Sequence, residues 1–455
     1  MKRIAIFLVL AAVTTNAALA AEEPELDWPP RLPGGKHVDS GSSPLLLKPT
    51  DTLRKGVTIA ATPPTIDFMY YDAQTYHVKS TLWSVWGDGL AVGEKYYSAI
   101  GDHMAPHGNA FVYEYDSTTQ RLVRVVDLQQ LLKLPQSHYT PGKIHSRLDL
   151  GSDGWLYFST HRGSTKVGLA ENRRHNHFKG GYIIRFNPEQ KKTEIVAHAP
   201  LQWQCIPASV LDGDRLIFYG GTADGLGEDP AKFLAYDVRK RKLLYSDDQG
   251  PSRYMIFARS TGKLYFHPGT SSPSRTEGPG QLVRFDPEKP GRPVPIAARC
   301  GLRSATMETP QGIVYTIDHD ELWAFDTKTE KAKSLGPSAV ASKTYTTSID
   351  ADPKTGRFLY YVPGAHGGAE KDGTPLVQYD VKRRRRKVVA FLHPYLYEKY
   401  GYVTLGTFGS AVSPEGDKVY ITFNGNRGTT RDQLDGRIRF NTCAMVVVHV
   451  PESER

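Results

Sequence analysis

Histidine, tyrosine and arginine residues recur at two positions of a repeating sequence pattern, and these side chains carry acid–base and anion-binding chemistry. One position is the start of the first strand of each repeat, and the other is the end of its second strand. These two positions lie at the same end of an antiparallel sheet, so we expect side chains from several repeats to converge. The strand-start candidates are His145, Cys205, Arg253, Tyr254, Arg303 and Tyr345, and the strand-end candidates are His103, His161, Arg162, Tyr219, His267, His319, His366 and Arg427.

The elements that must position these residues are short β-strands. One recurring element is a glycine followed by an apolar strand, seen at 154–158, 213–218, 262–266, 312–315, 356–360 and 416–420. A second is an aromatic residue followed by Asp or Asn, seen at 115–116, 186–187, 236–237, 285–286, 325–326 and 379–380. Each repeat therefore predicts four antiparallel strands over about 40–60 residues, which is typical of a propeller blade.

Seven such units open near residues 90, 143, 205, 253, 302, 344 and 405. The sequence predicts an all-β fold, a seven-bladed β-propeller of four-stranded antiparallel blades. The last unit lacks an outer strand, and we expect Gly56–Ala60 to supply it and close the ring. Residues 128–134 are the one segment with a helical pattern.

The N-terminal segment predicts export. Lys2 and Arg3 precede an apolar run, and Ala18-Leu19-Ala20 forms a cleavage site, so residues 1–20 are typical of a signal peptide. Residues 21–55 are rich in Pro, Gly and Ser and predict an arm or linker, followed by the propeller over 56–455. No later segment has the length of a membrane span. We expect a periplasmic or secreted protein, and a monomer.

The chain carries a formal charge of +9, and +7 after loss of Lys2 and Arg3. Such a charge favours a polyanionic partner, although it also serves solubility alone. The basic run 382–387 falls between two predicted strands, which indicates a solvated hairpin tip. No groove-reading motif accompanies it, so we expect no nucleic-acid partner.

Other chemistries find little support. The sequence has no Gly-x-Ser-x-Gly elbow and no His-Glu-x-x-His motif. Asp and Glu are scarce among the predicted channel positions, which argues against a two-carboxylate glycoside hydrolase. Three cysteines cannot form a disulfide framework. His267, Cys300 and His319 are a candidate structural zinc site, but their spacing matches no zinc motif and favours an ordinary buried cysteine. We expect no required cofactor.

One stretch resembles a known family. Lys143-Ile144-His145-Ser146 and the run from Asp153 through His161 to Gly163 resemble the second blade of β-propeller polysaccharide lyases, with the ulvan lyases nearest. These are exported seven-bladed propellers that cleave sulfated, uronate-containing polysaccharides by β-elimination, using two histidines, a tyrosine and an arginine. The resemblance implies that His145 and His161 are the histidine pair. It leaves open the tyrosine, with Tyr254 preferred to Tyr219, and the arginine, among Arg162, Arg253 and Arg303.

We therefore expect an acidic polysaccharide as substrate, with His145, His161 and Tyr254 catalytic. Arg162, Arg253, Arg303 and Tyr219 are the expected substrate-binding residues. Two alternatives remain open. One is a non-catalytic propeller that binds glycans or proteins at the cell surface, and the other is a metal- or quinone-dependent enzyme.

Overall fold

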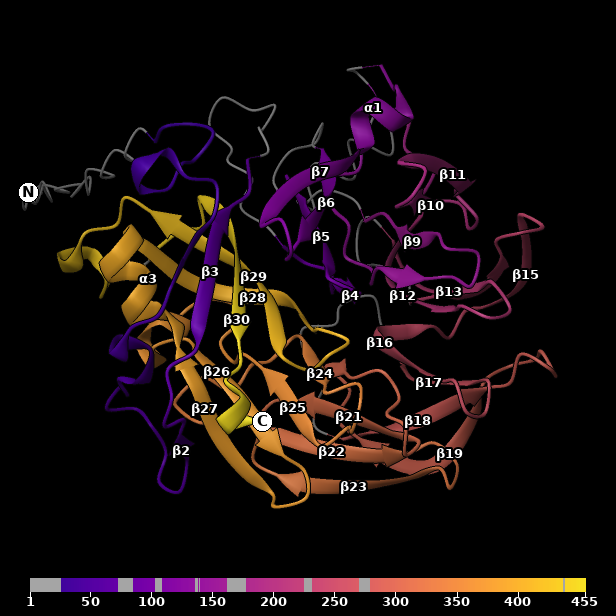
Figure 1. Ribbon diagram of the computed structural model, residues 1–455. Coiled ribbons are helices and arrows are strands. Elements are labelled where there is room, and N and C mark those ends of the chain that lie inside the picture. The colour runs from indigo at the N-terminus through magenta and orange to yellow at the C-terminus, as the bar shows by residue number, and fades with distance from the viewer. Residues whose placement is uncertain are drawn as a thin grey trace, which may run out of the picture.

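The computed structural model describes residues 26–72, 85–102, 109–135, 138, 140–161, 177–224, 231–269, 279–436 and 438–455, so the expected signal peptide lies outside them. Within these ranges the strands form seven sheets around a central axis (Figure 1). Each sheet contains four antiparallel blade strands, and two sheets carry a fifth. The prediction of a seven-bladed β-propeller is confirmed.

The innermost strand of each blade comes first in the chain, except that the last blade takes its outer strand from the N-terminal region. The first four blades are β4 (Leu90–Val92), β5 (Lys95–Gly101), β6 (Ala110–Asp116) and β7 (Arg121–Asp127); β8 (Asp149–Leu150), β9 (Leu156–Ser159), β10 (Tyr182–Asn187) and β11 (Lys192–His198); β12 (Gln204–Asp212), β13 (Ile217–Asp224), β14 (Phe233–Asp237) and β15 (Lys242–Asp247); and β16 (Pro251–Ala258), β17 (Lys263–Pro268), β18 (Gly280–Phe285) and β19 (Val294–Cys300).

The remaining blades follow the same order. They are β20 (Ser304–Ala305), β21 (Ile313–Asp318), β22 (Glu321–Asp326) and β23 (Lys331–Gly336); β24 (Ile349–Ala351), β25 (Phe358–Tyr361), β26 (Pro375–Asp380) and β27 (Arg385–Phe391); and β28 (Tyr402–Val412), β29 (Lys418–Arg427), β30 (Thr442–His449) and β3 (Thr65–Tyr70). Helix α1 (Leu128–Leu132) lies in the predicted helical segment, whereas α3 (Leu392–Tyr400) was not expected.

Both recurring sequence elements have a local structural cause. Gly154 and Gly262 turn between the first two strands of their blades with φ of 76° and 68°, a conformation that costs glycine little. The Asp or Asn after the aromatic residue caps the next turn. Asp326, for example, accepts hydrogen bonds from the backbone N–H groups of Lys328 and Thr329, both at 2.9 Å. Turn chemistry thus explains why the repeat is visible in the sequence.

The strand that closes the ring is not the expected one. β3 pairs antiparallel with β30, in the register Thr65–His449 to Tyr70–Ala444. The predicted segment Gly56–Ala60 instead contains β2 (Thr58–Ile59), which adds in parallel to β27 of the sixth blade. Length and burial distinguish the two segments, because β3 buries its last five residues whereas β2 is too short to cover a sheet edge.

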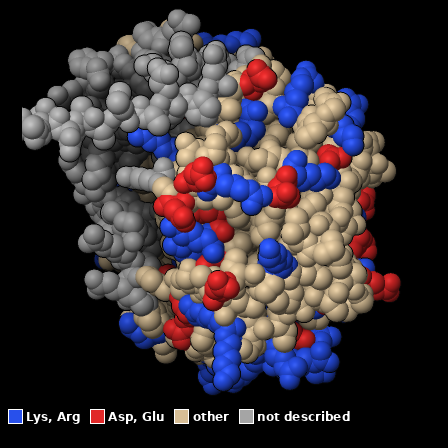
Figure 2. Space-filling view, turned by 90° about the vertical axis from the view of Figure 1, so that its left-hand side faces the viewer, with Lys and Arg blue, Asp and Glu red and all other residues tan. Residues whose placement is uncertain are grey.

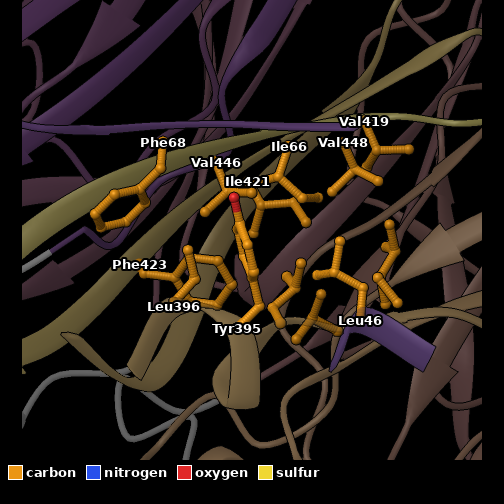
Figure 3. Close-up of a cluster of buried hydrophobic side chains, with 14 of the residues drawn as sticks. Leu46, Ile66, Phe68, Tyr395, Leu396, Val419, Ile421, Phe423, Val446 and Val448 are labelled. Carbon is orange, nitrogen blue, oxygen red and sulfur yellow. The ribbon is translucent and has the colours of Figure 1, made fainter. Parts of the chain in front are cut away.

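The closing strand belongs to the largest apolar cluster shown in Figure 3. Ile66 and Phe68 of β3 pack there with side chains of β29, β30 and α3. Leu46, from the segment 21–55, is fully buried in the same cluster. β1 (Asp39–Gly41) of that segment pairs with β3. Each buried aliphatic or aromatic side chain contributes about 1.5–3 kcal/mol, so this contact fastens the two chain ends together.

The basic run forms the turn between β26 and β27, which confirms the predicted hairpin tip. In Figure 2, Lys and Arg gather at the lower end of the face that carries α3 and β3, where Figure 1 places the start of β27. The side chains of Lys382, Arg383 and Arg384 are exposed, and no carboxylate of the described residues lies within ion-pair distance. No helix in the described ranges has the length and apolarity needed to cross a bilayer.

Candidate functional site

A small hollow opens on the propeller axis, and all seven blades contribute to it. Most of its lining comes from the starts of the innermost strands or from the residues just before them, as the sequence pattern predicts. It is lined by Trp86, Asp88, His145, Arg147, Pro207, Ala208, Ser209, Tyr254, Met255, Arg303, Thr347 and Phe408. Three of the predicted site residues, His145, Tyr254 and Arg303, therefore meet in one pocket.

His145 and His161 lie beside each other at this pocket, with ring centroids 5.8 Å apart. The neighbouring backbones of Lys143 and His161 form a bridge, in which the His161 N–H donates to the Lys143 carbonyl at 2.9 Å. His145 Nδ1 is 3.1 Å from the Pro207 carbonyl oxygen. A carbonyl can only accept, so Nδ1 carries the hydrogen and Nε2 is the basic nitrogen of the neutral ring.

Arg303 and Tyr345 form a second pair at the same end of the channel. Arg303 Nε donates to the Tyr345 hydroxyl at 2.7 Å, and the guanidinium lies 5.0 Å from the Tyr345 ring centroid. His366 stacks on the ring of Tyr345, with the two ring centroids 4.5 Å apart. The ring centroid of Trp86 lies 6.2 Å from that of His145 and 6.3 Å from that of His366. Aromatic contacts therefore connect the histidine pair with the Arg303–Tyr345 pair.

Three half-buried polar residues, Asp88, Tyr254 and Arg147, lie together in the pocket lining. The Tyr254 hydroxyl donates to Asp88, and burial together with this carboxylate raises the pKa of Tyr254 well above its usual value. Burial also raises the pKa of Asp88. Burial opposes the charge of Arg147, but nearby Tyr254, Asp149 and Asp88 raise its pKa. Tyr254 is thus held protonated, and Arg147 is held as a cation.

Four buried polar atoms of the pocket lack a hydrogen-bond partner among the described residues. They are Asp88 Oδ1, Ser209 Oγ, Arg303 Nη2 and Arg147 Nε, the last of which lies 3.6 Å from Asp149 Oδ1, beyond hydrogen-bond distance but within that of an ion pair. Folded proteins leave few such atoms unsatisfied, because each costs about 1–3 kcal/mol. Their convergence in one hollow indicates a site built for a polar ligand. Two cationic donors suit a carboxylate, while a carboxylate acceptor and a hydroxyl suit sugar hydroxyl groups.

Other predicted site residues do not reach the pocket. Tyr219 is fully buried in the apolar cluster of Phe233, Phe257 and Phe285, so its expected place in substrate binding is wrong. Tyr219 was expected at the end of a second strand, but it is the third residue of β13, where its side chain packs between blades. Arg162 and the side chain of Arg253 lie outside the described residues, so their roles stay predictions.

The candidate zinc residues are not brought together as a metal site. His267 and Cys300 are buried in the fourth blade, where burial lowers the pKa of His267 and raises that of Cys300 to about 12. His319 points away on an exposed turn, with its side chain 66% exposed and Nδ1 2.9 Å from Asp318. No group of three His, Cys, Asp or Glu side chains in the described ranges is arranged to hold a metal ion.

The sequence pattern missed Trp86, Asp88 and Arg147. Arg147 lies two residues after His145, and alternation puts both on one side of an extended segment, so this signal was present. The expectation that carboxylates are scarce along the channel was also wrong. Asp149 is buried and Asp350 half-buried on innermost strands, where they accept backbone N–H groups of the neighbouring blades at 3.1 and 2.9 Å. These two tie blades together, and Asp88 is the single acid among the pocket lining residues.

Comparisons with known proteins find remote structural similarity. No protein-family model matches the sequence, and no curated protein matches it significantly. Among solved structures, the chain is similar to an oligogalacturonate lyase in complex with manganese, at 11% identity and a TM-score of 0.49 over 91% of this chain and 97% of that one.

Two further matches are equally distant. Oligogalacturonate lyase from Vibrio parahaemolyticus shows 10% identity and a TM-score of 0.48 over 92% and 99% of the two chains. The WD40 repeats of RRP9 show 9% identity and a TM-score of 0.45 over 83% and 97%. The function must therefore be argued from the pocket itself.

Proposed function

We propose that this protein is an exported polysaccharide lyase that cleaves an acidic, uronate-containing polysaccharide, with or without sulfate groups, by β-elimination. The observation that carries the proposal is the convergence of unsatisfied cationic and hydroxyl-binding atoms beside a histidine pair in one hollow. A uronic acid sugar offers the matching groups, a carboxylate and adjacent hydroxyls. The net positive charge of the chain would draw such a polyanion towards the channel.

The carboxylate of the substrate would bind to Arg303 Nη2 and Arg147 Nε. Neutralising this charge lowers the cost of removing the C5 proton, because the developing negative charge spreads onto the carboxylate. Asp88 Oδ1 and Ser209 Oγ would hold ring hydroxyls. Tyr254 supports this arrangement by fixing Asp88, since its hydroxyl donates to that carboxylate.

His145 is placed to remove the C5 proton through Nε2, because Pro207 holds its other nitrogen. The electron pair of the C5–H bond then forms the C4=C5 double bond, and the C4–O bond breaks. His161, 5.8 Å away between ring centroids, would return a proton to the leaving oxygen. One sugar ring can contact both histidines at this separation, which is what proton removal at C5 and proton donation to the oxygen on C4 require.

A substrate screen tests the proposal. The purified protein is incubated with ulvan, glucuronan, polygalacturonate and glycosaminoglycans, and absorbance is followed in the ultraviolet band of unsaturated uronates. We expect a rising signal on at least one polymer. The absence of a signal on all of them would overturn the lyase assignment.

A second candidate function is binding without cleavage. The aromatic wall of Trp86, Phe408 and His366 favours it, because stacked rings suit sugar faces and need no proton transfer. Retention of the protein on a polysaccharide that it leaves intact would support this alternative. A His145→Ala variant that keeps full retention would then agree with it.

A further inference from the structure

An exposed tryptophan lies on the same end of the propeller as the pocket. The side chain of Trp203 is 43% exposed, and Trp203 is the one aromatic residue among the large exposed hydrophobic residues of the described ranges. It lies in the connection between β11 and β12, which crosses from an outer strand to an innermost strand. Connections of this kind lie on the face where the first strands begin, which is the face of the pocket.

The backbone around Trp203 is held firmly in an unusual conformation. Trp203 has a φ of 63°, a left-handed value that is costly for a bulky residue and persists only where the surroundings enforce it. Its N–H donates to the Lys179 carbonyl at 2.8 Å, and Ala199 N–H donates to Gly181 O at 2.8 Å. A side chain at Gly180 would meet Ala199 at 2.9 Å, so glycine allows the two segments to pack this closely.

The same contacts connect Trp203 to the His161 side of the pocket. The Gly181 N–H donates to the Gln204 carbonyl at 2.9 Å, and Ile206 N–H donates to the carbonyl of Thr160, the residue before His161, at 3.2 Å. Pro207, which holds His145, is four residues after Trp203, roughly 13 Å along an extended chain. An oligosaccharide of a few sugars spans such a distance.

Lys179 adds a charge close to Trp203 in space, because its backbone carbonyl accepts the Trp203 N–H. Its side chain is exposed, and no carboxylate of the described residues lies within ion-pair distance of it. It is close enough to His198 to help lower the pKa of that histidine, after the larger effect of burial. An aromatic face beside an ammonium group suits a sugar ring that carries an anionic substituent.

We propose that Trp203 and Lys179 form a rim subsite, which binds a second sugar of the acidic polysaccharide outside the pocket. The indole stacks on the apolar face of the ring, and the ammonium pairs with its carboxylate or sulfate. This inference rests on the proposed function for the identity of the ligand. It adds that the protein prefers long chains, because short oligosaccharides cannot reach the pocket and the rim subsite together.

The test measures binding and cleavage separately. Trp203→Ala and Lys179→Gln are compared with two control variants, Leu244→Ala on the outer strand β15 and Lys382→Gln in the β26–β27 turn on the opposite face. Leu244 is 46% exposed, so its truncation removes a similarly exposed apolar side chain. Affinity electrophoresis in gels containing polygalacturonate or ulvan reports binding, and initial rates on the full polymer and on the shortest cleaved oligosaccharide report KM and kcat.

We expect Trp203→Ala to raise KM for the polymer about three- to tenfold, as loss of one aromatic stacking contact implies, with kcat and the shortest substrate unaffected. Trp203→Phe should restore most of the affinity. Trp203→Gly, which adopts the left-handed backbone easily, should behave as the alanine variant does. Both controls should match the wild type.

Unchanged KM and unchanged gel retention in Trp203→Ala would overturn the rim subsite. A fall in kcat on all substrates together with a lower Tm would also overturn it, because it would show a structural role. Should the wild type cleave no polymer, weaker retention of Trp203→Ala alone would still support the subsite while the lyase assignment fails. The two proposals therefore fail by different measurements.

Discussion

Two histidine-containing regions occupy the same position of the repeat but have opposite surroundings. His161 follows the second strand of its blade and meets His145 at the open pocket. His267 ends the second strand of the fourth blade, yet it is 7% exposed, with its ring packed over Gly280 and beside buried Cys300. The first region gathers four unsatisfied polar atoms around an open hollow, whereas packing closes the second around a single one, His267 Nε2. The position in the repeat therefore identifies candidate site residues, and the packing of neighbouring blades decides which of them can contact a ligand.

Replacing one histidine in each region by alanine gives the sharpest test of this contrast. We expect His145→Ala to lower turnover about 10²–10⁴-fold with little change in Tm, because it removes an acid–base group from an open pocket. His267→Ala should lower Tm and retain activity per folded molecule, because it leaves a cavity. Turnover and thermal unfolding are measured on the same preparations. The opposite result, in which His145→Ala lowers Tm and His267→Ala lowers turnover, would contradict this contrast.

Substitutions in β9, the strand that precedes His161, distinguish the loss of packing from the loss of a polar contact. Phe158 is 1% exposed between the first two blades, and Phe158→Ala should lower the free energy of unfolding by about 3–5 kcal/mol. Ser159 points to the other side, which indicated tolerance of alanine, but its hydroxyl donates to the Ile206 carbonyl at 2.7 Å. Ser159→Ala should therefore cost about 1–3 kcal/mol. Urea unfolding measures both, and equal losses would contradict this order.

The buried carboxylates near the channel make a prediction about pH. Burial raises the pKa of Asp350 to about 6, so the fold favours its protonated form. Its contribution to stability is complete below the unfolded-state pKa near 4 and is lost as pH rises through about 6. Relative to Asp350→Asn, the wild type should lose up to about 3 kcal/mol between pH 4 and pH 7. Chemical denaturation across this range is the measurement, and a constant difference between the two proteins would refute the assignment.

A substitution at Arg303 tests whether the pocket recognises a carboxylate through the arrangement of the guanidinium nitrogens. Nε is occupied by Tyr345, and Nη2 has no partner among the described residues. Lysine keeps the charge but cannot serve both positions, so Arg303→Lys should lower kcat/KM about tenfold. The matched control is Arg239→Lys, on the exposed turn after β14, which should retain wild-type kinetics. Wild-type kcat/KM in Arg303→Lys would remove Arg303 from substrate recognition.

The sequence by itself determined the blade repeat, because its causes are local. Gly154 and Gly262 take left-handed turns, and Asp326 caps the backbone two and three residues ahead, so the same residue types recur in six of the seven units. Period-two alternation then predicted strands, and the slot at the end of the second strand predicted His161. Neither signal requires knowledge of distant contacts.

Only the tertiary structure decided which candidates form a site and which segment closes the ring. The repeat pattern placed Tyr219 and His161 in the same slot, but Tyr219 lies early in β13, where apolar rings from two blades enclose it, whereas His161 follows β9. Asp88 and Tyr254 meet although 166 residues separate them, and β3 pairs with β30 across almost the whole chain. Such pairings depend on how seven sheets twist and pack around one axis, and because that geometry is shared among all of them, no local stretch of sequence contains it.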